Sequence, residues 1–107
     1  MFDEITQMIN ANYSDDLYLD IIADKFNITP EYLSTYFKKH AGINITTYIN
    51  NVRIEQAKEL ICATTLPIKD IGEKVGFANV NTFIRIFKNI TGTTPGKFKK
   101  PTNGDSQ

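Results

Sequence analysis

The chain has 107 residues, 41% of them hydrophobic and 11% aromatic, so it can form one domain around its core but not a second independent one. A single cysteine excludes an internal disulfide, and we expect a cytoplasmic protein because neither a secretory leader nor a membrane-spanning apolar run is present. The net charge of zero at first disfavours a nucleic-acid partner. However, residues 1–31 hold seven acids and one base, whereas residues 32–107 hold eleven bases and five acids, which fits a protein that turns one face to a polyanion.

Helices are predicted along most of the chain, and the first two cover residues 2–13 and 19–26, where apolar residues recur at helical spacing. The second ends before Asn27, a residue that tolerates the left-handed turn conformation. A third helix starts at residues 29–30, because threonine caps a helix and proline suits its first position. It stops near Gly42.

A longer helix is predicted for residues 45–63, and its apolar stripe changes direction partway along. The first face carries Ile45, Tyr48, Ile49 and Val52. The second face lies about 140° further round and carries Ile54, Ala57, Leu60 and Ile61. We therefore expect one helix to serve two separate cores.

The second half of the chain repeats the pattern of a short helix, a turn and a longer helix. A short apolar stripe over residues 68–75 predicts the first of these helices, and Asn79 can cap the next one, which runs to about Ile90. Residues 95–99 can add one further turn. Residues 101–107 are small and polar enough to be a disordered tail.

The two halves also match residue by residue. In the longer helices the matching residues lie 50 positions apart, with Leu33, Phe37, Lys38 and Gly42 corresponding to Phe83, Phe87, Lys88 and Gly92. In the shorter helices the shift is 49, with Ile22, Ala23 and Lys25 corresponding to Ile71, Gly72 and Lys74. We therefore predict an all-α domain at residues 1–100, with about seven helices. Two helix-turn-helix units, at about residues 17–42 and 67–92, are joined by the linking helix.

The second helix of each unit combines an apolar face with an outer face. The apolar faces carry Leu33, Tyr36, Phe37 and His40 in the first unit, and Phe83, Ile86, Phe87 and Ile90 in the second. The outer faces carry Glu31, Ser34, Thr35 and Lys38 in the first unit, and Asn81, Ile84, Arg85 and Lys88 in the second. Each outer face offers groups that can reach base edges and a lysine that can reach a phosphate, so these helices suit the major groove of double-stranded DNA.

In the second unit, Arg85 is the main candidate for a base contact, because its guanidinium can pair bidentately with guanine O6 and N7. A solvated arginine is the alternative interpretation. Asn81 can read adenine. Ile84 is unusual on an exposed face and can meet a thymine methyl, although single exposed apolar residues are common.

In the first unit, Ser34 and Thr35 can contact either bases or phosphates, and both interpretations stay open. Glu31 can accept from cytosine N4, but its place near the helix start favours a role in stabilising the helix dipole. Six lysines across both units are phosphate candidates, although each alone resembles an ordinary solvated side chain: Lys38, Lys39, Lys88, Lys97, Lys99 and Lys100.

Two sets of residues carry a resemblance to a known family. The more specific set lies between Ile68 and Phe98 and comprises Ile71-Gly72-Glu73-Lys74-Val75-Gly76-Phe77, Phe83, Arg85, Phe87-Lys88, Gly92, Thr94-Pro95 and Phe98. The looser set comprises Ile22-Ala23, Leu33, Phe37-Lys38-Lys39, Gly42, Tyr48-Ile49, Arg53, Ala57 and Leu60. Over about residues 5–100 the chain resembles the DNA-binding domain of AraC/XylS-type transcription regulators. It departs at Gly72, Phe98 and Lys99, where that family usually has alanine, tyrosine and arginine.

The resemblance implies a sequence-specific DNA-binding domain of a bacterial transcription regulator. Such a domain inserts two recognition helices into successive major-groove segments and needs no cofactor. In that family it commonly follows a ligand-binding sensor or a phosphorylatable receiver domain. We therefore expect such an N-terminal domain in the full protein, and RNA polymerase as a further partner.

Neither catalysis nor a metal site is expected. His40 and Cys62 lie on separate helices and are interpreted as core residues, and no CxxC, HExxH or phosphate-binding glycine loop is present. A cysteine-dependent alkyl-transfer repair protein is an alternative, since some carry a related domain, but Cys62 lacks the flanking residues for that chemistry. A third interpretation, a helical protein-interaction module, predicts exposed apolar patches instead of two matched outer faces.

Overall fold

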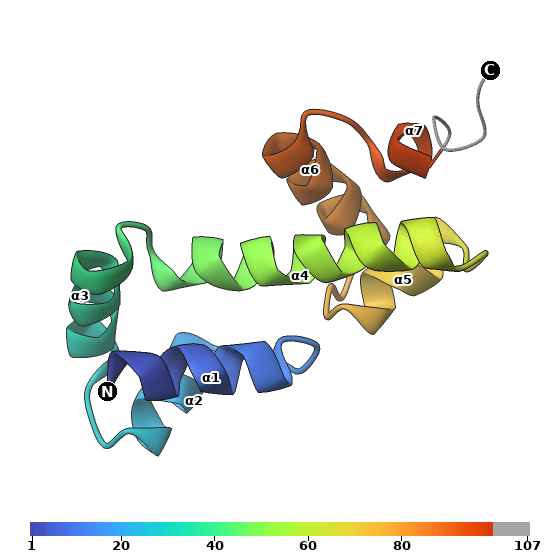
Figure 1. Ribbon diagram of the computed structural model, residues 1–107. Coiled ribbons are helices and arrows are strands. Elements are labelled where there is room, and N and C mark those ends of the chain that lie inside the picture. Colours follow the sequence, from blue (N-terminus) through green and yellow to red (C-terminus); the bar gives the residue numbers. More distant parts are fainter. Residues whose placement is uncertain (100–107) are drawn as a thin grey trace. The chain divides into compact units, whose positions relative to one another are not determined.

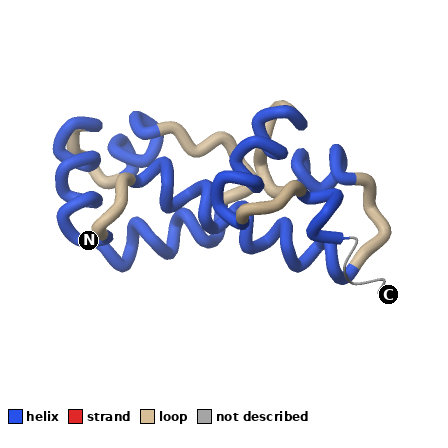
Figure 2. The backbone as a smooth tube through the Cα atoms, turned by 90° about the horizontal axis from the view of Figure 1, so that it is seen from above, coloured by secondary structure: helices blue, strands red, loops and turns tan. Residues whose placement is uncertain are grey.

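The computed structural model describes residues 1–99, in which every regular element is a helix (Figure 1). The helices are α1 (Phe2–Asn12), α2 (Leu19–Lys25), α3 (Pro30–Ala41), α4 (Ile45–Ala63), α5 (Ile68–Lys74), α6 (Val80–Thr91) and α7 (Pro95–Lys99). They confirm the predicted all-α fold, and the loops between them are short (Figure 2). Within this range no helix combines the length and apolarity that crossing a membrane requires. The predicted disordered tail at residues 101–107 lies outside the described residues.

The chain divides into two units, Met1–Val52 and Arg53–Gln107, the second being described as far as residue 99. The division falls within α4. Its N-terminal part contributes Ile45 and Ile49 to the core of the first unit. Its C-terminal part contributes the buried residues Ile54, Ala57 and Ile61 to the second unit. The two apolar stripes of this helix therefore serve different units.

The core of the first unit is built from α1, α2, α3 and the start of α4. Its buried residues are Ile5, Ile9, Ile22, Ala23, Leu33, Phe37, Ile45 and Ile49. The Phe37 ring lies 5.2 Å from the Phe2 ring and 5.3 Å from the Tyr48 ring, centroid to centroid. Because Phe37 is fully buried between α1 and α4, it holds α3 in a fixed orientation on the unit.

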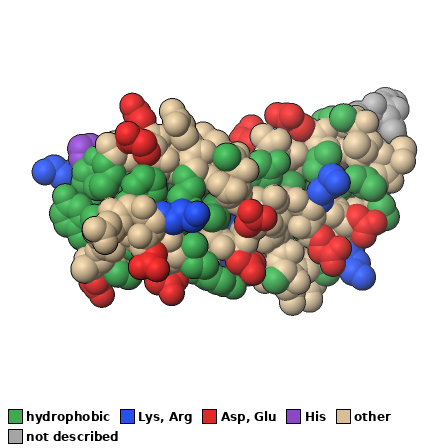
Figure 3. Space-filling view, turned by 90° about the horizontal axis from the view of Figure 1, so that it is seen from below, with side chains coloured by type: hydrophobic (Ala, Val, Ile, Leu, Met, Phe, Trp, Pro, Cys, Tyr) green, Lys and Arg blue, Asp and Glu red, His purple; other side chains and the backbone are tan. Residues whose placement is uncertain are grey.

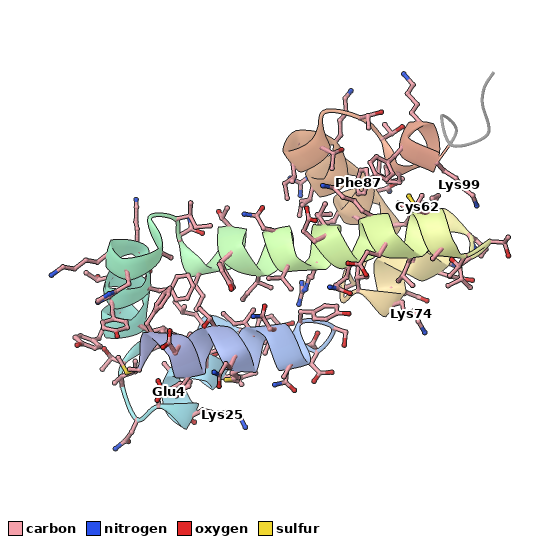
Figure 4. The ribbon with its side chains drawn as sticks, viewed as in Figure 1. Glu4, Lys25, Cys62, Lys74, Phe87 and Lys99 are labelled. Carbon is pink, nitrogen blue, oxygen red and sulfur yellow. The ribbon has the colours of Figure 1, made fainter. Side chains whose placement is uncertain are left out.

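The core of the second unit centres on two fully buried phenylalanines of α6, Phe83 and Phe87. The Phe83 ring lies 5.4 Å from Phe77 and 5.8 Å from Phe87, and the Phe87 ring lies 5.4 Å from Phe98 of α7. Phe87 of α6 is labelled in Figure 4. The guanidinium carbon of Arg53 lies 5.5 Å from the centroid of the Phe77 ring. The Phe83 ring is therefore enclosed by neighbours that are themselves packed.

Three residues that were expected to be buried are exposed. His40 and Cys62 are exposed rather than part of the core, and Ile90, expected on the buried side of α6, is 40% exposed. His40 and Ile90 lie near the ends of their helices. The His40 ring lies 4.3 Å from the Tyr36 ring and 5.8 Å from the Phe2 ring, centroid to centroid. Cys62 follows the buried Ile61, and one step along a helix turns a side chain by about 100°.

Candidate nucleic-acid interface

The turns that join α2 to α3 and α5 to α6 have the same backbone hydrogen bond. The two bonds run from Ile28 N–H to Ala23 O at 3.0 Å and from Phe77 N–H to Gly72 O at 2.9 Å. In each turn the residue before the donor has a positive φ, 59° at Asn27 and 113° at Gly76. Few L-residues tolerate this region, so asparagine and glycine favour the turn at these positions. Each unit therefore contains a helix-turn-helix.

The second helix of each unit is capped in the same way at both ends. Thr29 Oγ1 accepts from the N–H of Tyr32 at 3.1 Å. Asn79 Oδ1 accepts from the N–H groups of Asn81 and Thr82 at 2.8 and 3.2 Å. At the C-termini, Gly42 and Gly92 adopt the left-handed conformation with φ of 82° and 86°. These caps fix where α3 and α6 begin, and hence which residues lie on their outer faces.

Replacing the cap of α6 should destabilise the chain measurably. Asn79→Ala removes the acceptor of two backbone N–H groups, and we expect the free energy of unfolding to fall by about 1 kcal/mol. Urea denaturation followed by circular dichroism measures the change. Asn79→Asp, which keeps the acceptor, is the control and should recover most of the loss. Equal losses for both variants would contradict a capping role.

The predicted outer face of α3 is accessible in the structure. Glu31, Thr35, Lys38 and Lys39 are exposed, and Ser34 is half-buried. Three of these residues, Glu31, Ser34 and Thr35, line one hollow of about 360 Å³. The structure thus brings together the three base-reading candidates of the first unit, and the two lysines lie further along the same helix.

The outer face of α6 differs from the expectation at one position. Asn81, Arg85 and Lys88 are exposed, but Ile84 is half-buried, so part of its side chain is covered by the unit. Among the lysines of α7, Lys97 is exposed and Lys99 is half-buried. Lys100 lies outside the described residues.

Sequence reasoning missed three accessible residues beside the candidates of the first unit. Leu19 and Pro30 complete the lining of the hollow. The sequence predicted Leu19 only as part of the apolar stripe of residues 19–26, and Pro30 only as the start of a helix. Tyr32 is 53% exposed, and its ring stacks on Tyr36 at 5.9 Å. The one signal in the sequence that could have indicated Tyr32 as a site residue is its position next to Glu31.

Most acids of the first unit lie on α1, α2 and the loop between them, where Lys25 of α2 is the one lysine or arginine. Every acid of residues 1–31 is exposed, and six of the seven belong to α1, α2 and the loop between them. On the face drawn in Figure 3, acidic and basic side chains lie scattered among hydrophobic ones. The bases Lys38 and Lys39 lie on α3 instead. Among residues 1–99, no three His, Cys, Asp or Glu side chains are placed to hold a metal ion.

Known sequences carry the same domain. The family model described as a helix-turn-helix domain matches residues 22–101. The chain is 38% identical over 98 residues to YtdP, an uncharacterized HTH-type transcriptional regulator of Bacillus subtilis. It is 39% identical over 98 residues to AdaA, a bifunctional transcriptional activator/DNA repair enzyme of the same organism. Each match covers 92% of this chain but only 13% of YtdP and 46% of AdaA, so the chain spans less than half of either relative.

Solved structures share the fold. The C-terminal domain of AraT, a response regulator from Geobacillus stearothermophilus, matches with a TM-score of 0.90 at 33% identity, over 99% of this chain and 88% of that one. An AraC-type regulator from Chromobacterium violaceum matches with a TM-score of 0.82 at 26% identity, over 92% and 88%. The DNA-binding domain of AdpA, solved with a target DNA, has a TM-score of 0.86 at 13% identity, over 92% and 88%, which is a likeness of fold alone. The chain therefore belongs to the AraC-type helix-turn-helix DNA-binding domains of transcription regulators.

Proposed function

We propose that this chain binds double-stranded DNA sequence-specifically, with α3 and α6 as recognition helices that enter successive segments of the major groove. The observation that carries the proposal is the paired architecture itself. Both units have the same turn, the same kind of N-cap and the same left-handed glycine C-cap, and both present an outer face with polar groups. A major groove admits a helix of this kind, and its base edges carry the sequence information.

The residues of these faces take different roles in the proposal. Glu31, Ser34, Thr35, Asn81, Ile84 and Arg85 are the base-reading candidates. Lys38, Lys39, Lys88, Lys97, Lys99 and Lys100 are the phosphate candidates. The base readers lie in the first two turns of each helix, and Lys38 and Lys88 follow one turn or more later. Phosphate contacts at that distance would fix the register in which base edges are read.

Selection of bound sites from random duplex DNA tests this function directly. We expect repeated rounds to enrich a site with two conserved segments, one for each unit. An enriched site whose affinity exceeds that of scrambled duplex by about a hundredfold or more would support sequence-specific binding. Failure to enrich any motif, with duplex affinity independent of sequence, would contradict it.

Arg85 and Lys88 should give different signatures on a panel of single-base variants of the selected site. Arg85→Ala should cost roughly 1–3 kcal/mol and relax the preference at one base pair, because a guanidinium pairs bidentately with guanine. Lys88→Ala should weaken all sequences about equally, because a phosphate contact carries no base information. Fluorescence anisotropy measures both. A uniform loss for Arg85→Ala would reassign it as a phosphate contact.

YtdP and AdaA extend well beyond the match, and AraT is a response regulator of which this fold is the C-terminal domain. We propose that this chain likewise works behind a sensor or receiver domain, in the cytoplasm, and that RNA polymerase is a partner. AdaA also has a repair activity, but this chain covers only 46% of AdaA, and the helix-turn-helix model matches residues 22–101 of this chain. We therefore propose regulation, not catalysis.

A further inference from the structure

The hollow of the first unit lies between the start of α2 and the start of α3. Its lining has two chemical parts. Leu19 and Pro30 supply apolar surface, and Glu31, Ser34 and Thr35 supply a carboxylate and two hydroxyls. At about 360 Å³ it has room for an edge of a nucleobase.

The Glu31 carboxylate is available for an outside partner. Glu31 is exposed, and no hydrogen bond or ion pair joins its side chain to another residue of the range 1–99. The N-cap of α3 is provided by Thr29, whose Oγ1 accepts from Tyr32 N–H at 3.1 Å. The helix start therefore does not require Glu31 as a cap, and its negative charge excludes a phosphate as the occupant of the hollow.

The four base edges of the major groove can be compared with this lining. Guanine presents two acceptors and thymine presents the acceptor O4, and a carboxylate repels both. Cytosine and adenine present an amino donor. In adenine the amino group lies beside the acceptor N7, whereas in cytosine it lies beside the apolar C5–H. Only cytosine offers a donor for Glu31 next to an apolar edge for Leu19 and Pro30. The hydroxyls of Ser34 and Thr35 both donate and accept, so they do not discriminate between the bases.

We propose that the hollow of the first unit receives the major-groove edge of a cytosine, with Glu31 accepting from N4 and with Leu19 and Pro30 facing C5. This inference rests on the proposed DNA binding and adds a base identity to it. The position equivalent to Thr35 in the second unit is Arg85, which donates and suits guanine. The position equivalent to Glu31 is Asn81, whose amide both donates and accepts and suits adenine, so the two units would read different bases.

The apolar part of the hollow also predicts an effect of cytosine methylation. A methyl group on C5 would lie against Leu19 and Pro30, where burying it is favourable. 5-Methylcytosine at this position should bind at least as tightly as cytosine, with a gain of up to about fourfold. Thymine carries the same methyl but replaces the N4 donor by O4, so it should bind roughly tenfold more weakly than cytosine.

The experiment replaces each cytosine of the selected site in turn with thymine or 5-methylcytosine and measures affinity by anisotropy at one salt concentration. At one position in the segment read by the first unit, the wild-type chain should bind the thymine duplex more weakly than the cytosine duplex. At the same position it should bind the 5-methylcytosine duplex at least as tightly as the cytosine duplex. Glu31→Gln should abolish the cytosine–thymine difference there, because an amide both donates and accepts. Glu59→Gln, an exposed acid on α4, removes the same charge and should keep the difference.

Different results would contradict the cytosine assignment and the proposed DNA binding on which it rests. If no duplex is bound specifically, the proposed function fails. If a site is bound but Glu31→Gln keeps every base preference of the wild type, the cytosine assignment is overturned. It is also overturned if Glu31→Gln changes the preference only at a position where the wild type prefers adenine, guanine or thymine. If 5-methylcytosine lowers the affinity at the position that depends on Glu31, the proposed apolar contact with C5 is overturned.

Discussion

Duplex affinity is expected to fall roughly 150- to 1,800-fold between about 50 and 200 mM salt, because four to six lysines would displace counterions from phosphates. This expectation does not conflict with a net charge of zero. Counterion release depends on the phosphates that are neutralised locally, and the acids of the first unit lie mainly on α1, α2 and their loop. We expect a slope of about −3.6 to −5.4 for the logarithm of affinity against the logarithm of salt concentration.

The salt series has a matched pair of lysine variants. Lys88→Ala should reduce the magnitude of the slope by about 0.9, since one phosphate contact is lost. Lys58→Ala should leave the slope unchanged, because Lys58 lies on α4 and pairs with Glu55 at 2.8 Å. A flat salt dependence for the wild-type chain would rule out the lysines as phosphate contacts.

Gly72→Ala should destabilise the second unit by about 2 kcal/mol, although alanine is the better helix former. A Cβ at Gly72 would lie 2.7 Å from Cδ2 and 3.0 Å from Cγ of Phe83. Helix propensity favours alanine by about 1 kcal/mol, but overpacking a core costs up to about 3 kcal/mol. The overpacking term should win, because Phe77 and Phe87 already enclose the Phe83 ring. Denaturant unfolding measures the difference.

The first unit suggests how this clash can be relieved. The positions equivalent to Gly72 and Phe83 are Ala23 and Leu33, both in the first core. Phe83→Leu should therefore reduce the cost of Gly72→Ala, so the double variant should be more stable than the sum of the single effects predicts. Gly96→Ala in α7, where an added Cβ meets no atom within 4 Å, is the control and should be neutral or stabilising by up to about 1 kcal/mol. Additive losses in the double variant would contradict the steric account.

Residue patterns predicted the helices of this chain well, because the signals at helix ends are local. Pro30 marks the start of α3, and the bounds of α4 at residues 45 and 63 agree with its apolar stripes. The sequence shows that Gly72 stands where the family usually has alanine, but it does not show why. The reason depends on the ring of Phe83, which packing brings close to Gly72 from another helix.

Burial near helix ends was predicted less well, because it depends on where neighbouring elements stop. His40 and Ile90 continue the apolar spacing of their helices, yet both are exposed. The candidate site shows the same limit. The outer residues of α3 could be predicted from helical periodicity, whereas their meeting with Leu19 in one hollow required the angle between α2 and α3.

Cys62 gives the chain one solvent-accessible thiol. In aerated buffer two chains can become joined through it by a disulfide, and a joined pair carries two copies of the domain. Such a pair binds a long duplex more tightly through avidity alone, so apparent affinity should depend on whether reductant is present. The same thiol offers a single defined position for a maleimide dye, which would supply the fluorescence signal for binding assays without entering either core.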